Sequence, residues 1–360
     1  MMANYMLTPK LPRYIVFESD DWGSIRTSNR TAYDFLVSNG YLMDKSQYSY
    51  DCIETPEDLS RLQDVLTNFK DSTGNHPVFT ANSVMANPDF HKIAESDFQE
   101  YSYTAVKDEQ TLFDGSTLVR AWKEASKLGV FFPQIHCREH IQWWAWLEDL
   151  RMGISDAIDT FPLNMCGVPK VVSKLGISYF DPVYIRDSYT EANEDAIPNS
   201  IKEGCEIFKD IFGYYSKTTV APVVFWNEIA ELAWHESGIE VIQGSWLQSI
   251  KTDNKISFTN RKLGEKNLFG QQYLVRNCNF EPRRGANADS CLKEIARAFQ
   301  FNCPAIICTH RVNYVSSIDK KGADDSLSQL KELLDKILRK WPDVKFITSQ
   351  TLGENLNKKI

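Results

Sequence analysis

The feature that most constrains the fold of this chain is an alternation of short apolar segments with longer stretches of helical periodicity. The apolar segments are rich in Val, Ile, Phe and Tyr, and their spacing is typical of a parallel sheet whose strands are connected by helices. We predict eight strands, over Tyr14–Glu18, Pro77–Ala81, Phe131–Ile135, Thr218–Ala221, Ile239–Gln243, Tyr273–Arg276, Ala305–Cys308 and Val344–Ile347.

Six helices are predicted between these strands. They cover Pro56–Asn68, Ser116–Lys127, Glu139–Leu150, Asn227–His235, Asp289–Phe299 and Asp324–Trp341. The last has the clearest pattern, because its leucines and isoleucines recur at intervals of three or four residues and form one apolar face.

The chain of 360 residues is long enough for one large α/β barrel or for two smaller domains. No linker of distinct composition divides it, and we expect a single catalytic domain over residues 1–360. The polar stretch at residues 249–267 is predicted to leave the core as a loop or a small hairpin.

Charge and apolar patterning exclude several classes of protein. The net charge is −8 and no run of Lys or Arg is present, which argues against nucleic acid or an anionic membrane as the main partner. The first residues do not have the pattern of a signal peptide, and no apolar run approaches the roughly 18 residues of a membrane span. We therefore expect a cytoplasmic protein without membrane insertion.

Eight cysteines are scattered along the chain without a Cys-x-x-Cys pair. This spacing favours reduced and mostly buried thiols over a disulfide framework or a structural zinc site.

Two adjacent aspartates follow the first predicted strand, in the stretch ESDDWGSI. In a βα-repeating fold the carboxyl ends of the strands face the ligand crevice, so Asp20 and Asp21 are candidates for chemistry. One of them could simply cap a helix. Alternatively, one carboxylate binds a metal while its neighbour stays free as a base, since successive side chains leave an extended backbone in different directions.

Two histidines stand four residues apart in the stretch HCREH. His136 follows a predicted strand, and a helical turn would bring His140 to the same side. The pair could be a capping or core feature, but with a strand-end aspartate it would leave a zinc ion with an open coordination position. A thiolate nucleophile at Cys137 is disfavoured, because histidines that hold a metal cannot also serve as its base.

A third histidine, His310, follows the apolar strand in PAIICTHRVNY. Its position matches those of Asp20 and His136, and the three strand ends are expected to converge on one site. His76, His91 and His235 do not follow strands and are expected to be structural.

Together, Asp20-Asp21, His136-x-x-x-His140 and a late strand ending in His310 resemble the polysaccharide deacetylases, the NodB-homology group also called carbohydrate esterase family 4. The resemblance implies a distorted, incomplete (β/α) barrel. It also implies that Asp21, His136 and His140 bind a divalent metal, usually zinc, with Asp20 as general base and His310 as general acid.

The reaction implied by the resemblance is hydrolysis of an acetamide or acetate ester on an acetylated carbohydrate substrate, a sugar or polysaccharide precursor. The metal would polarise the acyl oxygen and activate water, and the two other side chains would move the protons. Backbone N–H groups near Pro222–Val224 are expected to stabilise the oxyanion.

The chain departs from the family pattern at several positions. Cys137 replaces the usual Ser or Thr, Glu18-Ser19 replaces Thr-Phe, and the arginine motif that braces the base is not evident in VAPVVFW. The arginines that could instead pair with Asp20 are Arg26, Arg138, Arg283 and Arg284. Trp22 and Trp226 are further candidates for substrate contact, although aromatic residues at such boundaries usually belong to the core.

Two other functions are compatible with these residues. One is a related metal-dependent hydrolase that cleaves a C–N bond in an amide that is not a sugar. The other is a non-catalytic carbohydrate-binding barrel, which is disfavoured because a binding module does not need a free base beside a metal ligand.

Overall fold

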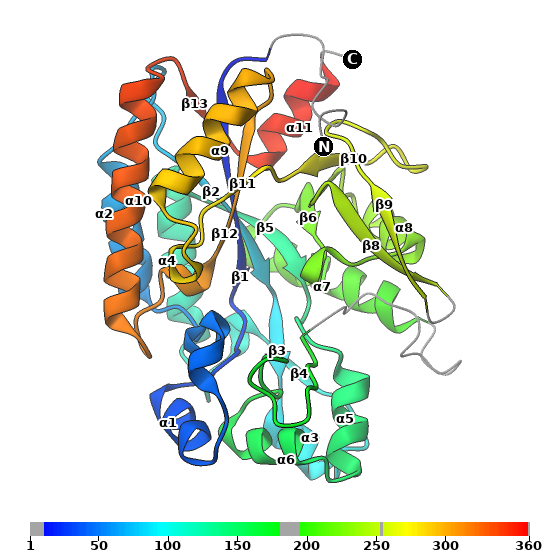
Figure 1. The fold of residues 1–360 in the computed structure, drawn as a ribbon. Helices are drawn as coiled ribbons and strands as arrows, with labels where there is room; N and C mark the ends of the chain where they lie inside the picture. Colours follow the sequence, from blue (N-terminus) through cyan, green and yellow to red (C-terminus); the bar gives the residue numbers. More distant parts are fainter. Residues whose placement is uncertain (1–10, 181–194, 253–254, 359–360) are drawn as a thin grey trace.

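A computed structural model describes residues 11–180, 195–252 and 255–358 of the chain, and its central element is a parallel sheet of nine strands (Figure 1). All eight predicted strands belong to this sheet. Its members are β1 (Tyr14–Trp22), β2 (Phe79–Val84), β5 (Phe131–Cys137), β6 (Thr218–Val220), β7 (Val241–Gly244), β10 (Gln272–Val275), β11 (Cys278–Asn279), β12 (Ala305–His310) and β13 (Lys345–Phe346).

The strands follow the order β10-β7-β6-β5-β2-β1-β12-β11, and β13 pairs with the first residues of β1. The two outermost strands, β10 and β11, are consecutive in the chain and are joined by Arg276 and Asn277. The chain therefore crosses from one edge of the sheet to the other, although no hydrogen-bonded ladder joins these two strands in the described part of the chain. This architecture is the distorted, incomplete (β/α) barrel that the sequence predicts.

Helices surround the sheet, and all six predicted helices are present. The helices are α1 (Arg30–Ser38), α2 (Pro56–Thr67), α3 (Phe90–Glu95), α4 (Gly115–Lys127), α5 (Trp143–Arg151), α6 (Ser155–Thr160), α7 (Ala196–Phe212), α8 (Glu228–Glu236), α9 (Ala288–Gln300), α10 (Lys320–Lys340) and α11 (Ser349–Asn357). In Figure 1, α2 and α10 lie on one side of the sheet and α8 on the other.

The main hydrophobic core lies between the sheet and the helices around it. The buried face of α10 contains Leu327, Leu330, Leu334 and Ile337, as the periodicity predicts. A smaller apolar cluster, which includes Phe90, holds α3, α5 and α6 together below the sheet (Figure 1).

Two short antiparallel pairs lie outside the barrel. The predicted excursion at residues 249–267 is a hairpin of β8 (Leu247–Thr252) and β9 (Lys255–Asn260). The second pair consists of β3 (Ala86–Pro88) and β4 (Tyr103–Ala105).

All eight cysteines lie within the described ranges and are free thiols; seven are buried and Cys308 is partly exposed, in agreement with the prediction. In the same ranges, no helix combines the length and the apolar character needed to cross a membrane.

Candidate active site

A bulge in β1 lets both aspartates face one cavity. Ser19 pairs with Ala81 and Trp22 with Ser83, so β1 contains one residue more than β2 over this stretch. Asp21, within the bulge, has a φ of 76°, a left-handed conformation that Asp tolerates better than most residues. In a regular strand the two neighbouring side chains would point to opposite faces, whereas here both line the same cavity.

A second bulge lies at the same level on β5. Ser83 pairs with Ile135 and Val84 with Cys137, so His136 occupies the extra position. The expectation that a helical turn aligns His140 with His136 is wrong, because α5 begins only at Trp143 and His140 lies in the turn before it. That turn nevertheless brings the two rings to a centroid distance of 5.0 Å.

Asp21, His136 and His140 converge on one point. The Oδ1 atom of Asp21 lies 3.6 Å from Nε2 of each histidine. This separation is too long for a hydrogen bond and is near the spacing of about 3.4 Å between ligands that each lie about 2.1 Å from a tetrahedral zinc ion. All three side chains are buried.

The hydrogen bonds and charges of the two histidines fit a metal site. His136 Nδ1 is bonded to the carbonyl of Val220, which leaves its Nε2 for a ligand. His140 Nδ1 has no hydrogen-bond partner among the described residues. Burial and the nearby Arg26 hold the pKa of His140 well below its ordinary value, so the ring is neutral, as a metal ligand must be.

Asp20 lies beside this triad and is held by an arginine. Arg276 donates from Nη1 to Oδ2 (2.7 Å) and from Nη2 to Oδ1 (2.8 Å), and Asn82 donates to Oδ1 (2.7 Å). Burial by itself raises the pKa of Asp20, but Arg276, with a smaller contribution from the nearby histidines, more than offsets burial and lowers the pKa to about 2. Asp20 is therefore an anion at neutral pH.

The arginine that pairs with Asp20 is Arg276. The prediction that one of four other arginines would pair with Asp20 is therefore wrong. The signal for Arg276 was its position at the end of a predicted strand, the criterion that had singled out Asp20 and His310. The four proposed arginines have other surroundings: Arg26 bonds Asp21, Arg138 pairs with Glu139 and Glu203, Arg283 pairs with Asp319, and Arg284 is exposed.

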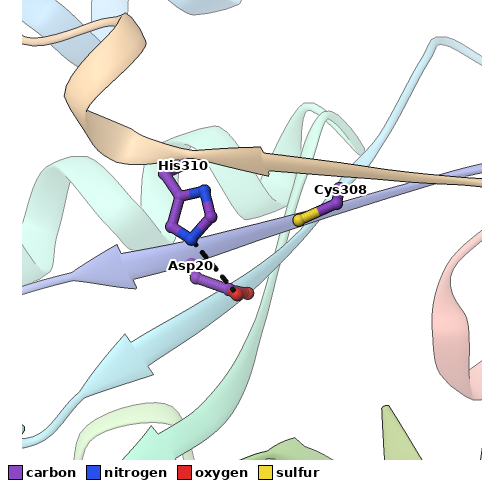
Figure 2. Close-up of side chains that lie close together, drawn as sticks. All are labelled: Asp20, Cys308 and His310. Atoms are coloured by element: carbon purple, nitrogen blue, oxygen red, sulfur yellow. Dashed lines mark ion pairs between the residues drawn. The ribbon is translucent and has the colours of Figure 1, made fainter. Parts of the chain in front are cut away.

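His310 lies across from Asp20 at the end of β12 (Figure 2), with Nε2 3.8 Å from Asp20 Oδ2. Its Nδ1 is hydrogen-bonded to Glu281, which also accepts a bond of 2.7 Å from Asn313 Nδ2. Burial alone would lower the pKa of His310, but Glu281 and Asp20 outweigh it and raise the pKa to about 9. The ring is a cation at neutral pH.

Glu281 was not predicted from the sequence. It follows β11, a strand of two residues that is too short to produce a recognisable apolar segment.

The two tryptophans considered for substrate contact are core residues instead. Trp22 and Trp226 are each 1% exposed, and their indole N–H groups donate to Ser19 and Glu231. Both are held by packing and hydrogen bonds inside the protein, so neither can contact a substrate. Trp246, by contrast, is 40% exposed and lines the cavity.

The cavity has a volume of about 1400 Å³ and is lined by all five predicted catalytic and metal-binding residues. Its volume exceeds the usual range of about 300–1000 Å³ for ligand cavities. The walls also contain Tyr48, Lys170, Phe180, Trp246 and Arg284. The cavity therefore has room for a ligand larger than one small molecule.

A strained turn forms part of the cavity wall. Val223 and Val224 both have a φ of 57°, which costs β-branched residues of order 1–3 kcal/mol each. Within the segment predicted to stabilise an oxyanion, Pro222 has no N–H and the Val224 amide donates to Ala221. The Val223 amide is therefore the remaining candidate in that segment.

A chain of buried ion pairs connects Asp21 to the loop that follows β1. Arg26 lies 3.2 Å from Asp21 Oδ1 and 3.7 Å from Asp51 Oδ2. Arg311 then bonds Asp51 (2.8 Å) and Glu54 (2.9 Å), and neither partner of these pairs is exposed. Removing one member would leave a buried charge unpaired, so this network holds the loop after β1 in place.

Comparisons with known proteins give similarity only at the level of structure. No family model and no curated protein matches the chain. A protein proposed to be a polysaccharide deacetylase, from Mycobacterium smegmatis, matches with a TM-score of 0.46 and 10% identity, over 98% of this chain and 93% of that one. A 4-alpha-glucanotransferase from Thermococcus litoralis matches with a TM-score of 0.45 and 7% identity, over 96% and 40%.

A pseudoenzyme of the CE4 family from Bacillus anthracis also matches, with a TM-score of 0.40 and 8% identity, over 96% of this chain and 66% of that one. A deacetylase-like protein, a transferase and an inactive protein thus match with comparable scores.

Proposed function

We propose that this protein is a metal-dependent hydrolase that removes acetyl groups, N- or O-linked, from a sugar or polysaccharide precursor. The observation that carries the proposal is the arrangement of three groups around one cavity: the Asp21–His136–His140 triad, an ionised Asp20 and a protonated His310. A binding protein would need none of these protonation states.

Asp21, His136 and His140 would hold the metal, most simply zinc, because their oxygen and nitrogen donors leave an open coordination position. A divalent cation there would polarise the acyl oxygen and lower the pKa of the attacking water from about 16 toward about 7.

Asp20 is the proposed general base. Arg276 keeps it ionised but also lowers its proton affinity, so Asp20 can accept a proton only from a water that is already acidified. Asn82 and Arg276 fix the carboxylate plane, which points one oxygen toward His310.

His310 is the proposed general acid. Its protonated ring would donate from Nε2 to the departing amine or alcohol. The 3.8 Å between Nε2 and Asp20 Oδ2 is longer than a hydrogen bond. The Nε2 proton of His310 is therefore not engaged in a hydrogen bond with Asp20. It remains available to the leaving group, and both side chains can face the scissile bond.

Acetate release from an N-acetylglucosamine oligomer and from an acetylated xylan oligomer tests this proposal on the zinc-loaded protein. We expect Asp20→Asn and His310→Gln each to lower kcat by about 10²–10⁴-fold while retaining metal. Asp21→Ala should lose the metal of the triad and, with it, the activity. His91→Ala is the matched control, since this histidine is exposed and should leave both unchanged.

Two results would contradict the proposal. One is hydrolysis of simple amides without acetate release from either oligomer, which would point to a substrate that is not a sugar. The other is a stoichiometrically loaded protein that binds the oligomers without any turnover, which would indicate a binding protein.

A further inference from the structure

Three potential metal ligands meet outside the Asp21–His136–His140 triad. Figure 2 shows Asp20 on β1 facing Cys308 and His310 on β12. Cys308 and His310 are two residues apart on one strand and so share a face, and Asp20 pairs with His310 in register. One ligand atom from each residue lies within 4.8 Å of the other two.

The three side chains face the cavity, and Glu281 orients His310. All of them line the cavity, and Cys308 is the one cysteine of the eight that is not buried. Glu281 holds His310 Nδ1, which leaves Nε2 directed toward Asp20. A carboxylate on the far nitrogen is the usual support of a metal-binding histidine.

We propose that Asp20, Cys308 and His310 form a second site, for a soft divalent cation such as Zn²⁺ or Cd²⁺. The site shares no ligand with the triad. Its oxygen, sulfur and nitrogen donors are a set that these ions prefer, and they leave a fourth position for water.

Arg276 competes with a cation at this site. Its Nη1 donates to Asp20 Oδ2 at 2.7 Å and to Cys308 Sγ at 3.3 Å, so it occupies the lone pairs that a metal would use. Coordination also requires that the Cys308 thiol and the His310 imidazolium each release a proton to solvent. The second site is therefore weaker than the triad.

Occupation of the second site should inhibit the enzyme, a consequence that rests on the proposed function. The cation would take the base Asp20 and the acid His310 at once. The first equivalent of zinc should thus activate the protein, and zinc in excess should inhibit it.

Cadmium titration of the metal-free protein tests the site without reference to activity. The readouts are the number of ions bound and the ultraviolet band of a thiolate bound to cadmium. Wild type should bind two ions and show the band. Cys308→Ser and Cys308→Ala should bind one ion without the band, and Asp21→Ala should bind one ion with it. Cys303→Ser, at a buried cysteine before the same strand, should behave as wild type.

The site is overturned if excess cadmium gives no thiolate band in wild type, or if the band survives in both Cys308 variants. It is also overturned if the band disappears in Asp21→Ala, since the thiol would then belong to the triad. Failure of the proposed function looks different: two ions and the band would remain, but no acetate would be released. If acetate is released, Cys308→Ala should lose the inhibition by excess zinc.

Discussion

At the scale of single residues, Asp20 and Asp21 differ through the arginines that hold them. Arg276 forms two hydrogen bonds with Asp20, whereas Arg26 contacts the Asp21 oxygen that faces the two histidines. Burial alone would favour neutral acids at both positions, and the arginines reverse that tendency. Adjacent residues of one type can thus serve as base and as ligand.

The role of Arg276 can be tested with Arg276→Gln. This variant leaves Asp20 and the buried Glu18 without their cation, so we expect the free energy of unfolding to fall by about 3–5 kcal/mol. The pKa of Asp20 should also rise, because burial is no longer offset. Urea unfolding and kcat are the measurements.

Arg283→Gln is the control for this test. Arg283 lines the same cavity but pairs with the partly exposed Asp319, so its loss should affect stability less and leave the base ionised. If both variants lose the same free energy of unfolding, the contact between Arg276 and Asp20 does not contribute more to stability than the contact between Arg283 and Asp319.

Glu281 should set the alkaline limit of activity. His310 is protonated below a pKa of about 9, so the rate should decline as the pH rises through about 9. In Glu281→Gln the main influence that raises this pKa is removed, and the decline should move to lower pH. The measurement is the pH profile of kcat for acetate release.

Glu294→Gln is the matched control for Glu281→Gln. Glu294 also lines the cavity but accepts a bond from the amide of Asn279 rather than from His310. An alkaline limb that stays in place in Glu281→Gln, or moves equally in both variants, would remove Glu281 from this role.

At the scale of elements, the two bulges and the turn after β1 shape the site. Gly23, directly after β1, has a φ of +83°, and its amide donates to the Glu54 carboxylate at 3.1 Å. A Cβ atom at this position would lie 2.6 Å from the carbonyl oxygen of Val84. Only glycine fits both the backbone conformation and the space, which explains the glycine at position 23.

Gly23→Ala and Gly40→Ala together separate the cost of the left-handed backbone from the cost of the steric clash. Both glycines have a φ of +83°, but a Cβ at Gly40 would meet nothing within 4 Å. We expect Gly40→Ala to cost about 1–2 kcal/mol for the left-handed conformation alone. Gly23→Ala should cost clearly more because of the clash. Urea unfolding measures both, and equal losses would contradict the packing explanation.

Two helices that the sequence did not predict contain glycines at points of close packing. A Cβ on Gly204 of α7 would lie 3.0 Å from the amide nitrogen of Arg138, and one on Gly353 of α11 would lie 2.5 Å from the Val241 side chain. Glycine is unfavourable inside an isolated helix, so propensity argues against both helices. Tertiary contacts that require the small residue outweigh that preference.

At the scale of the whole molecule, the triad joins segments that lie far apart in the sequence. A metal bound to β1, to β5 and to the turn after β5 should therefore stabilise the fold. Zinc at 100 times its Kd would add about 2.7 kcal/mol to the free energy of unfolding, since it binds only the folded state. We expect zinc to raise Tm in wild type and a chelator to reverse the effect.

Asp21→Asn should lose most of the zinc-dependent rise in Tm and keep only the smaller contribution of the weaker second site, whereas His91→Ala should retain the full rise because His91 lies on the surface. A rise of the same size in Asp21→Asn would mean that zinc stabilises the protein through other residues.

The sequence by itself determined the alternation of strands and helices and the group of polar residues at strand ends. Periodicity is a local property, and the carboxyl ends of parallel strands must meet at one edge of the sheet. Asp20, Asp21, His136, His140 and His310 could therefore be placed around one cavity before the fold was known.

Only the tertiary structure decided which charges meet inside that cavity. Arg276 is 256 residues from Asp20, and it reaches the carboxylate because the chain crosses there from β10 to β11. Glu281 lies just after β11, at the end of the same crossing, and contacts His310 there. Neither contact leaves a local pattern, since both depend on the crossing of the chain between the two edges of the sheet.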